Sequence, residues 1–226
     1  MNVANLPDVE HARFNMVEQQ IRPWDVLDQG VLALLFTVKR EEFVPPALRG
    51  LAFIDTEIPL RLESGDTGEF MLQPKLEARL LQELNLKSTD SVLEIGTGSG
   101  YQAALIAQQA HTVTSVEIQP RLVAFAQANL KRAGITNVKV ETGDASNGWG
   151  STEYDAILAT GSVLEVPDGL KYQLRVGGRL VIIVGQAPAM TARIITRTTA
   201  ASFETVSLFE TVVKPLRAAP VSRFKF

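Results

Sequence analysis

Apolar runs of strand length alternate with segments of helical spacing through the middle of this 226-residue chain. The predicted strands, the last of them preceded by a turn, lie at 91–95, 111–117, 137–142, 154–161 and 176–185. Continuous apolar runs of this kind are typical of strands that are buried on both faces. Regular alternation of strand and helix therefore predicts a parallel sheet covered by helices on both sides.

The first 74 residues read as helices and a loop placed ahead of this sheet. A helix from 9 to 21 is predicted to stop at Pro23, and Asp28 is predicted to cap a second helix. The predicted apolar stripe of the first helix consists of Phe14, Val17 and Ile21. Residues 51–68 are polar and punctuated by glycine, which predicts an irregular surface loop. A helix over 75–86 is expected to pack on the sheet.

The C-terminal part changes character. After a short helix predicted at 164–174, two strand-like runs at 193–199 and 207–213 leave no room for a helix between them. They are therefore expected to form an antiparallel hairpin at one edge of the sheet. We predict a single domain over 1–226, with an N-terminal elaboration over 1–74 and a Rossmann-like core with its hairpin over 75–226.

Composition excludes several classes of function. An apolar fraction of 46% suits one substantial core, and a formal charge of −3 argues against a general nucleic-acid binder. The chain has no cysteine and two histidines, so neither a thiolate nor a histidine-based metal site is expected. No apolar run is long enough to span a bilayer. We expect a soluble, cytoplasmic protein without membrane or nucleic-acid partners.

The most informative motif follows the strand at 91–95. It has the form ExGxGxG, with Glu94 near the end of the strand and glycines at 96, 98 and 100. Because Tyr101 stands where the dinucleotide fingerprint has its third glycine, that fingerprint is not matched. Glycine backbone and the N–H groups of a following helix suit a carboxylate, and an acidic side chain suits an amine or organises the turn.

Two further acids follow the next strands. Glu117 lies 21 positions after Gly96, close to the spacing at which doubly wound folds place a ribose-binding carboxylate. Asp144, followed by Ala145, closes the third strand and is placed to reach an adenine edge. Each acid alone also fits a plain role, the end of a strand or the cap of a turn. Together they predict a ligand with an amine, a carboxylate and a nucleoside, and S-adenosylmethionine has all three.

Several segments together resemble one family, the protein-L-isoaspartate O-methyltransferases. The segments are 16–22, 43–49, 92–104, 143–144, 154–157 and 177–181. The resemblance implies a class I S-adenosylmethionine-dependent methyltransferase fold, with a seven-stranded, mostly parallel sheet that ends in an antiparallel hairpin. It also implies S-adenosylhomocysteine as product and isoaspartyl proteins or peptides as substrate. The cofactor-site residues it implies are Glu94, Gly96, Thr97, Gly98, Gly100, Glu117, Asp144 and Ala145.

The chain departs from this family at the acceptor site. The family carries Thr-Ile-Ser, then one residue and proline, with the serine hydroxyl at the methyl acceptor. Here Phe70, Met71 and Leu72 stand ahead of Gln73 and Pro74. Leu72 at the serine position offers no donor to a carboxylate. Thr160 and Ser162, at the carboxyl end of the fourth predicted strand, are candidate donors in its place.

These observations rank four functions. The first is methyl transfer to an isoaspartyl carboxylate in damaged proteins. The second is a divergent methyltransferase with another acceptor, which the apolar residues at 70–72 would suit. The third is a cofactor-binding homologue without catalysis, and the fourth is a nicotinamide oxidoreductase. The sequence does not indicate an oligomeric state.

Overall fold

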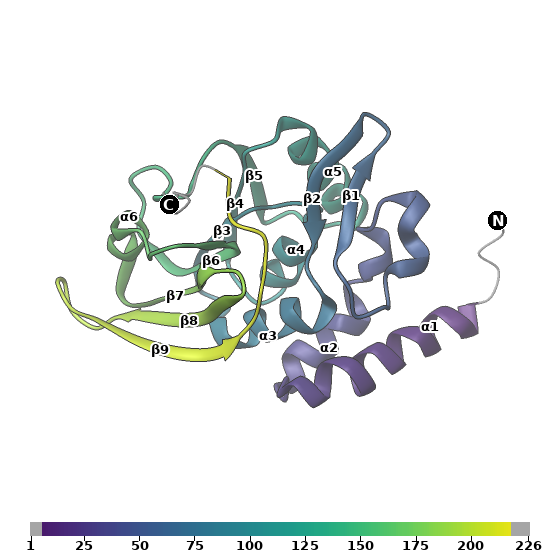
Figure 1. Ribbon diagram of the computed structural model, residues 1–226, viewed down its shortest axis with the longest axis horizontal. Helices are drawn as coiled ribbons and strands as arrows, with labels where there is room; N and C mark the ends of the chain where they lie inside the picture. Colours follow the sequence, from purple (N-terminus) through teal and green to yellow (C-terminus); the bar gives the residue numbers. More distant parts are fainter. Residues whose placement is uncertain (1–5, 218–226) are drawn as a thin grey trace, which may run out of the picture.

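A seven-stranded sheet forms the centre of the computed structural model, which describes residues 6–217 (Figure 1). Its order is β5-β4-β3-β6-β7-β8-β9, parallel from β5 to β7 and antiparallel from β7 to β9. The strands are β3 (Ser91–Ile95), β4 (Thr112–Glu117), β5 (Val138–Thr142), β6 (Tyr154–Val163), β7 (Leu174–Gln186), β8 (Ala189–Arg197) and β9 (Phe203–Glu210). The predicted fold, including the antiparallel end, is confirmed.

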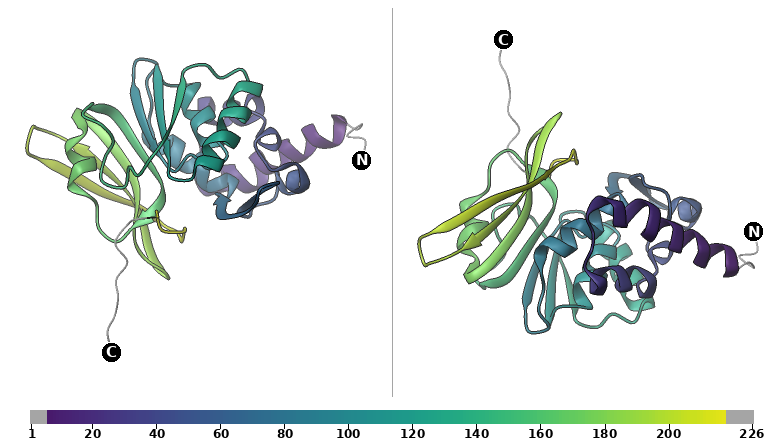
Figure 2. Two further views of the ribbon diagram at one scale, coloured as in Figure 1. Left: turned by 90° about the horizontal axis from the view of Figure 1, so that it is seen from above. Right: turned by 90° about the horizontal axis from the view of Figure 1, so that it is seen from below.

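Helices lie on both faces of this sheet, with α3, α4 and α5 on one face and α6 on the other. The helices are α1 (Leu6–Asn15), α2 (Gln29–Thr37), α3 (Pro74–Leu84), α4 (Tyr101–Ala107), α5 (Pro120–Arg132) and α6 (Asp168–Tyr172). A π-helical turn spans Met16–Ile21, and short 3-10 helices span Arg22–Trp24, Arg40–Glu42 and Pro46–Leu51. Figure 2 shows the N-terminal helices and the last strands at opposite ends of the molecule. No helix within residues 6–217 has the length and apolar character needed to cross a membrane.

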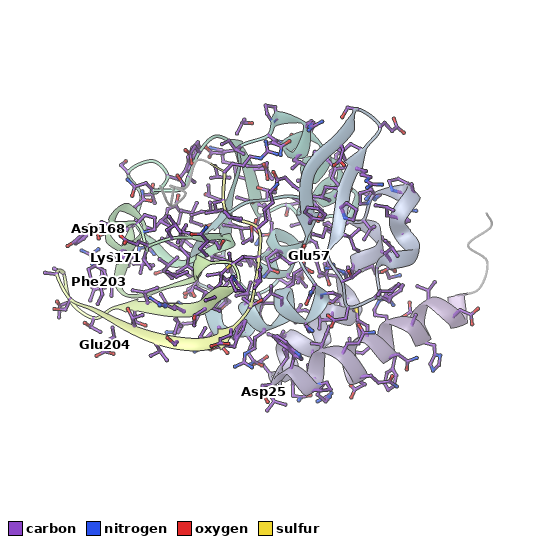
Figure 3. The ribbon with its side chains drawn as sticks, viewed as in Figure 1. Asp25, Glu57, Asp168, Lys171, Phe203 and Glu204 are labelled. Atoms are coloured by element: carbon purple, nitrogen blue, oxygen red, sulfur yellow. The ribbon has the colours of Figure 1, made fainter. Side chains whose placement is uncertain are left out.

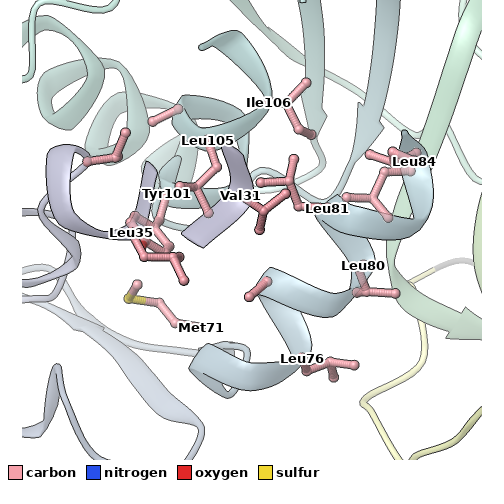
Figure 4. Close-up of a cluster of buried hydrophobic side chains, with 14 of the residues drawn as sticks. Val31, Leu35, Met71, Leu76, Leu80, Leu81, Leu84, Tyr101, Leu105 and Ile106 are labelled. Carbon is pink, nitrogen blue, oxygen red and sulfur yellow. The ribbon is translucent and has the colours of Figure 1, made fainter. Parts of the chain in front are cut away.

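Alternate residues of each central strand enter two separate cores, because successive side chains point to opposite faces. The larger core packs one face against α2, α3 and α4, and Leu35, Leu81, Leu105 and Tyr101 point toward one another in Figure 4. The strand residues on this side are Val92, Ala156, Leu158, Val181 and Ile183. The smaller core lies on the other face beneath α6 and contains Leu93, Ile95, Ile157, Leu180 and Ile182.

The first helix differs from its prediction. Val17 and Ile21 are fully buried, whereas Phe14 is 49% exposed. The cause is the π-helical turn that begins at Met16. A π turn takes one residue more per hydrogen-bonded ring than an α turn, so it rotates the buried face away from the side that carries Phe14.

The predicted surface loop over 51–68 is wrong for its second half. Residues from 58 onward form an antiparallel hairpin of β1 (Ile58–Leu62) and β2 (Gly65–Met71). Ile58 and Leu60 are fully buried, while the intervening positions are less so. This period of two is the signature of a strand with one buried face, and the acidic and glycine residues between 63 and 68 obscured it.

The bounds of two other predicted elements differ from those in the structure. The helix predicted over 164–174 is reduced to α6, which begins directly after Pro167. The C-terminal hairpin was expected two to four residues later in the chain than β8 and β9 lie. Neither shift changes the topology.

The larger core generates a test of stability. Replacing the fully buried Leu80 of α3 by alanine is expected to lower the free energy of unfolding by about 2 to 5 kcal/mol, because it leaves a cavity. Urea unfolding measures this change. Leu27→Ala is the matched control, since Leu27 is 62% exposed and is expected to shift stability by less than about 0.5 kcal/mol. Equal effects of the two variants would contradict the packing described here.

Candidate active site

A cleft opens at the carboxyl ends of β3, β4 and β6, where ligands bind in open α/β sheets. Including its open mouth, its volume is about 770 Å³. Its floor is formed by residues at or just beyond the carboxyl ends of β3, β4, β5 and β6, namely Ile95, Gly96, Gly98, Glu117, Ile118, Gly143, Asp144, Ala145, Ser146, Thr160 and Gly161. Several predicted site residues are thus brought together by the parallel topology.

The turn between β3 and α4 is held by contacts from two neighbouring strands. Gly96 has φ +93°, and a Cβ there would lie 2.4 Å from Oγ1 of Thr160, so a larger residue is excluded. The N–H of Gly98 donates to Oε2 of Glu117 at 3.0 Å. Gly96 and Gly98 line the cleft, and Gly100 does not. Gly100 lies beneath α5, where a Cβ would be 3.2 Å from that of Ala126.

Glu117 presents a carboxylate of fixed orientation to the cleft. It is 5% exposed, and its two oxygens accept the N–H groups of Gly98 and Gln119 at 3.0 and 2.9 Å. Burial raises the pKa of this carboxyl, while the two backbone hydrogen bonds act in the opposite direction. Each oxygen retains a lone pair for a further donor. A diol is a matching ligand for two such oxygens.

Glu94 lies behind the turn and outside the residues that line the cleft. It is fully buried, and the Ser115 hydroxyl donates to its Oε2. The hydroxyls of Thr97 and Ser115 are hydrogen-bonded to each other across 2.5 Å. Burial raises the pKa of Glu94 to about 8. Of the two roles expected from the sequence, contact with an amine or organisation of the turn, this network corresponds to the second.

Asp144 and Ala145 line the opposite side of the cleft. Oδ1 of Asp144 accepts the N–H of Ser146 at 2.9 Å, which closes a tight turn after β5. The indole of Trp149 packs beneath this turn, where a Cβ on Gly143 would be 2.3 Å from it. Together with the apolar Ile118, these residues suit a planar heterocycle.

Two segments cover the cleft, and we call them the cover: residues 57–72 and residues 214–217. The first contributes Glu57, which lies just ahead of β1 (Figure 3), and Glu69, Phe70 and Leu72. Burial raises the pKa of Glu57. The second segment contributes Lys214, Pro215, Leu216 and Arg217. Sequence reasoning missed Glu69 and 214–217, because no local signal indicates contacts between positions about 145 residues apart.

The cover is joined by ion pairs around one carboxylate. Lys214 donates to Oε2 of Glu69 at 2.8 Å and to the carbonyl of Gly68 at 2.5 Å. Arg217 donates to Oε1 of Glu69 and, at 2.9 Å, to the carbonyl of Thr67. Gln119, which follows Glu117, also donates to Glu69 at 3.1 Å. The hairpin of β1 and β2 is therefore linked both to the C-terminal segment 214–217 and to the floor of the cleft.

The three predicted acceptor-side residues have different positions. Leu72 lines the cleft, and its carbonyl accepts a hydrogen bond of 2.7 Å from the buried guanidinium of Arg40. Thr160 also lines the cleft, but its hydroxyl is bonded to the carbonyls of Ile95 and Gly96 at 2.9 and 2.8 Å.

Ser162 is the exception. It is 1% exposed, lies outside the residues that line the cleft, and donates to the carbonyl of Val213 at 3.3 Å. The expectation that it faces the acceptor is wrong, because β6 directs it toward the C-terminal segment.

Comparison with known proteins identifies the family. The family model for protein-L-isoaspartate(D-aspartate) O-methyltransferase matches residues 12–217. The chain belongs to this family. It is 42% identical over 186 residues to protein-L-isoaspartate O-methyltransferase 2 of Pelobacter propionicus, covering 82% of this chain and 80% of that protein. It is 43% identical over 183 residues to the protein-L-isoaspartate O-methyltransferase of Opitutus terrae, covering 79% and 76% of the two chains.

A solved structure shares the fold. A Plasmodium falciparum protein described under the same family name, in complex with S-adenosyl-L-homocysteine, superimposes with a TM-score of 0.76 at 21% identity. The match covers 92% of this chain and 97% of that one. The resemblance inferred from the sequence motifs is confirmed as family membership.

The buried Glu94 predicts a pH dependence of stability. Between its ordinary pKa of 4.5 and about 8, the folded state holds a proton that the unfolded state releases. The free energy of unfolding therefore falls as the pH rises through this window, with a slope of up to about 1.4 kcal/mol per pH unit. Glu94→Gln removes this pH-dependent contribution to stability. In urea unfolding between pH 5.5 and 7.5, we expect the free energy of unfolding of the variant to fall less steeply than that of the wild type. Parallel pH dependences of the two proteins would contradict this prediction.

Proposed function

We propose that this chain is an S-adenosylmethionine-dependent methyltransferase that methylates the isoaspartyl carboxylate of damaged proteins and peptides. The observation that carries this function is the extent of the family match. Every residue that lines the cleft lies within the matched residues 12–217. The curated relatives that are 42% and 43% identical to this chain over the aligned 186 and 183 residues carry the name of that activity.

The residues of the cleft fit the proposed cofactor. The Glu117 carboxylate is oriented by two N–H groups and suits ribose hydroxyls. Ile118 and the turn at 143–145 suit adenine, and Gly96 and Gly98 allow close approach of a ligand to the backbone. Four acids, Glu57, Glu69, Glu117 and Asp144, line the cleft against two cations, which suits a ligand that carries positive charge.

When bound, S-adenosylmethionine supplies a methyl group activated by its sulfonium. The tasks left to this chain are to align the acceptor and to exclude water. A carboxylate acceptor is already ionised at neutral pH, so no general base is required. The floor orients the cofactor through Glu117, and the cover over 57–72 and 214–217 shields the carboxyl ends of the strands from solvent.

A second candidate is methyl transfer to a less polar acceptor. Phe70 and Leu72 both line the cleft where the family carries hydroxyl side chains, and this observation favours it. That Thr160 and Leu72 contact the acceptor stays a prediction, as does the cytoplasmic location.

Methyl transfer from labelled S-adenosylmethionine distinguishes these functions. We expect label on an isoaspartyl peptide and none on the aspartyl peptide of the same sequence. In the isoaspartyl peptide the chain continues through the β-carboxyl group, so the α-carboxylate is free. The aspartyl peptide lacks this carboxylate, and isoaspartate is the residue that the family description names. Binding of S-adenosylhomocysteine without transfer to either peptide would exclude the repair function and favour another acceptor or a non-catalytic role.

The cofactor site has a separate test. Glu117→Ala is expected to weaken binding of S-adenosylhomocysteine by about 1 to 3 kcal/mol, through loss of charge-assisted hydrogen bonds. Calorimetry measures the dissociation constant directly. Glu204→Ala on the exposed face of β9 is the matched control and is expected to bind as the wild type does. An unchanged dissociation constant for Glu117→Ala would remove Glu117 from the site.

A further inference from the structure

The acceptor end of the cleft offers few hydrogen-bond donors. Phe70 and Leu72 are apolar, and Leu216 packs against Gly161, where a Cβ would be 2.8 Å from the leucine side chain. The single hydroxyl proton of Thr160 is directed to the backbone carbonyls of Ile95 and Gly96. A carboxylate held only by these groups would lose its hydrogen bonds to water and gain none from the protein, which costs considerable free energy.

Cations supply the missing donors. Within the described part of the chain, Lys214 and Arg217 are the two cationic residues that line the cleft. Their side chains are 42% and 46% exposed, and both are paired with the single carboxylate of Glu69. At this point of the cover, two positive charges share the single negative charge of Glu69, although the cleft as a whole is lined by four acids and two cations. A further carboxylate placed beside Lys214 and Arg217 is therefore attracted locally by both cations.

Lys214 has one N–H donor that its present contacts do not use. An ammonium group has three N–H donors, and the contacts with Gly68 and Glu69 use two of them. If Lys214 turns from Glu69 to a bound carboxylate, Glu69 still accepts hydrogen bonds from Arg217 and Gln119. The exchange leaves neither carboxylate without a partner.

The backbone of Lys214 is fixed to the end of β6. The N–H of Ser162 donates to the carbonyl of Lys214 at 3.1 Å, and the N–H of Leu216 donates to the carbonyl of Ser162 at 2.9 Å. With the bond from the Ser162 hydroxyl to Val213, these contacts attach the segment two residues beyond Thr160. Lys214 is therefore held at the carboxyl end of the sheet, next to Thr160 and Gly161.

We propose that Lys214 binds the carboxylate of the methyl acceptor, in exchange for its ion pair with Glu69. This inference rests on the proposed function, because it assumes that the acceptor is a carboxylate. Lys214 is then a specificity-determining residue. It supplies a charge-assisted hydrogen bond where Phe70, Leu72 and Leu216 are apolar and the Thr160 hydroxyl is already bonded. Ser162 is the positioning residue that anchors the segment carrying it.

Equilibrium binding of two peptides tests this role independently of turnover. One contains isoaspartate, and the other is the same peptide with the isoaspartyl α-carboxyl converted to a carboxamide. In the presence of S-adenosylhomocysteine, Lys214→Met is expected to weaken binding of the carboxylate peptide about tenfold and to leave the carboxamide peptide unchanged. Lys214→Arg is expected to retain the preference for the carboxylate. Lys131→Met, which removes the same charge from the exposed end of α5, is the control.

Glu69→Gln separates recognition from a purely structural link. If Lys214 binds the acceptor, loss of the competing negative charge is expected to strengthen binding of the carboxylate peptide several-fold. If Lys214 only ties the cover together, Glu69→Gln and Lys214→Met would both weaken binding of both peptides, and that result would overturn the inference. So would a wild-type protein that binds the two peptides equally.

The proposed function and the role of Lys214 are contradicted by different results. The proposed function is contradicted if the wild type transfers no methyl group to the isoaspartyl peptide, whatever its binding preference. In that case a preference for the carboxylate that Lys214→Met abolishes still supports carboxylate recognition by Lys214.

Discussion

The hydrogen bond from the N–H of Gly98 to the carboxylate of Glu117 is the contact on which the site depends. It ties the turn after β3 to the end of β4, while Thr160 ties the same turn to β6. Three parallel strands thereby hold one backbone turn in place before any ligand binds. Preorganisation of this kind reduces the loss of conformational freedom on binding. The buried network of Glu94, Ser115 and Thr97 supports the turn from behind.

The cover is built on a different principle from the floor. Hydrogen bonds between adjacent strands and the turns that follow them position the floor, whereas long-range ion pairs hold the cover. Glu69 is the centre of these pairs, because Lys214, Arg217 and Gln119 all donate to it. Partly exposed pairs are weak individually and sensitive to salt. Backbone hydrogen bonds anchor 214–217 to β6, so it is the ion pairs between the two segments of the cover that are easier to rearrange than the floor.

The departure at Phe70, Met71 and Leu72 gains a physical explanation from the C-terminal segment. The hairpin lacks hydroxyl donors at these positions, and the cations of 214–217 lie across the same cleft. Arg40 meanwhile fixes the carbonyl of Leu72, so this end of the hairpin is well anchored despite its apolar side chains. Family membership and an apolar stretch at 70–72 beside the cleft are therefore compatible in one structure.

The sequence by itself determined the sheet, its antiparallel end and the floor of the cleft. Continuous apolar runs specify buried parallel strands, and the carboxyl ends of such strands share one edge, so Gly96, Glu117 and Asp144 had to converge. Only the tertiary structure decided the cover and the fate of the remaining candidates. Ser162, Gly100 and Glu94 are close in sequence to residues that line the cleft, but none of them lines it. Ser162 faces the C-terminal segment, Gly100 lies at the contact between α4 and α5, and Glu94 points into the interior. The whole seven-stranded sheet separates Glu69 from Lys214 in the chain, so the two residues meet only when that sheet has folded. No local pattern in the sequence encodes a contact of that range.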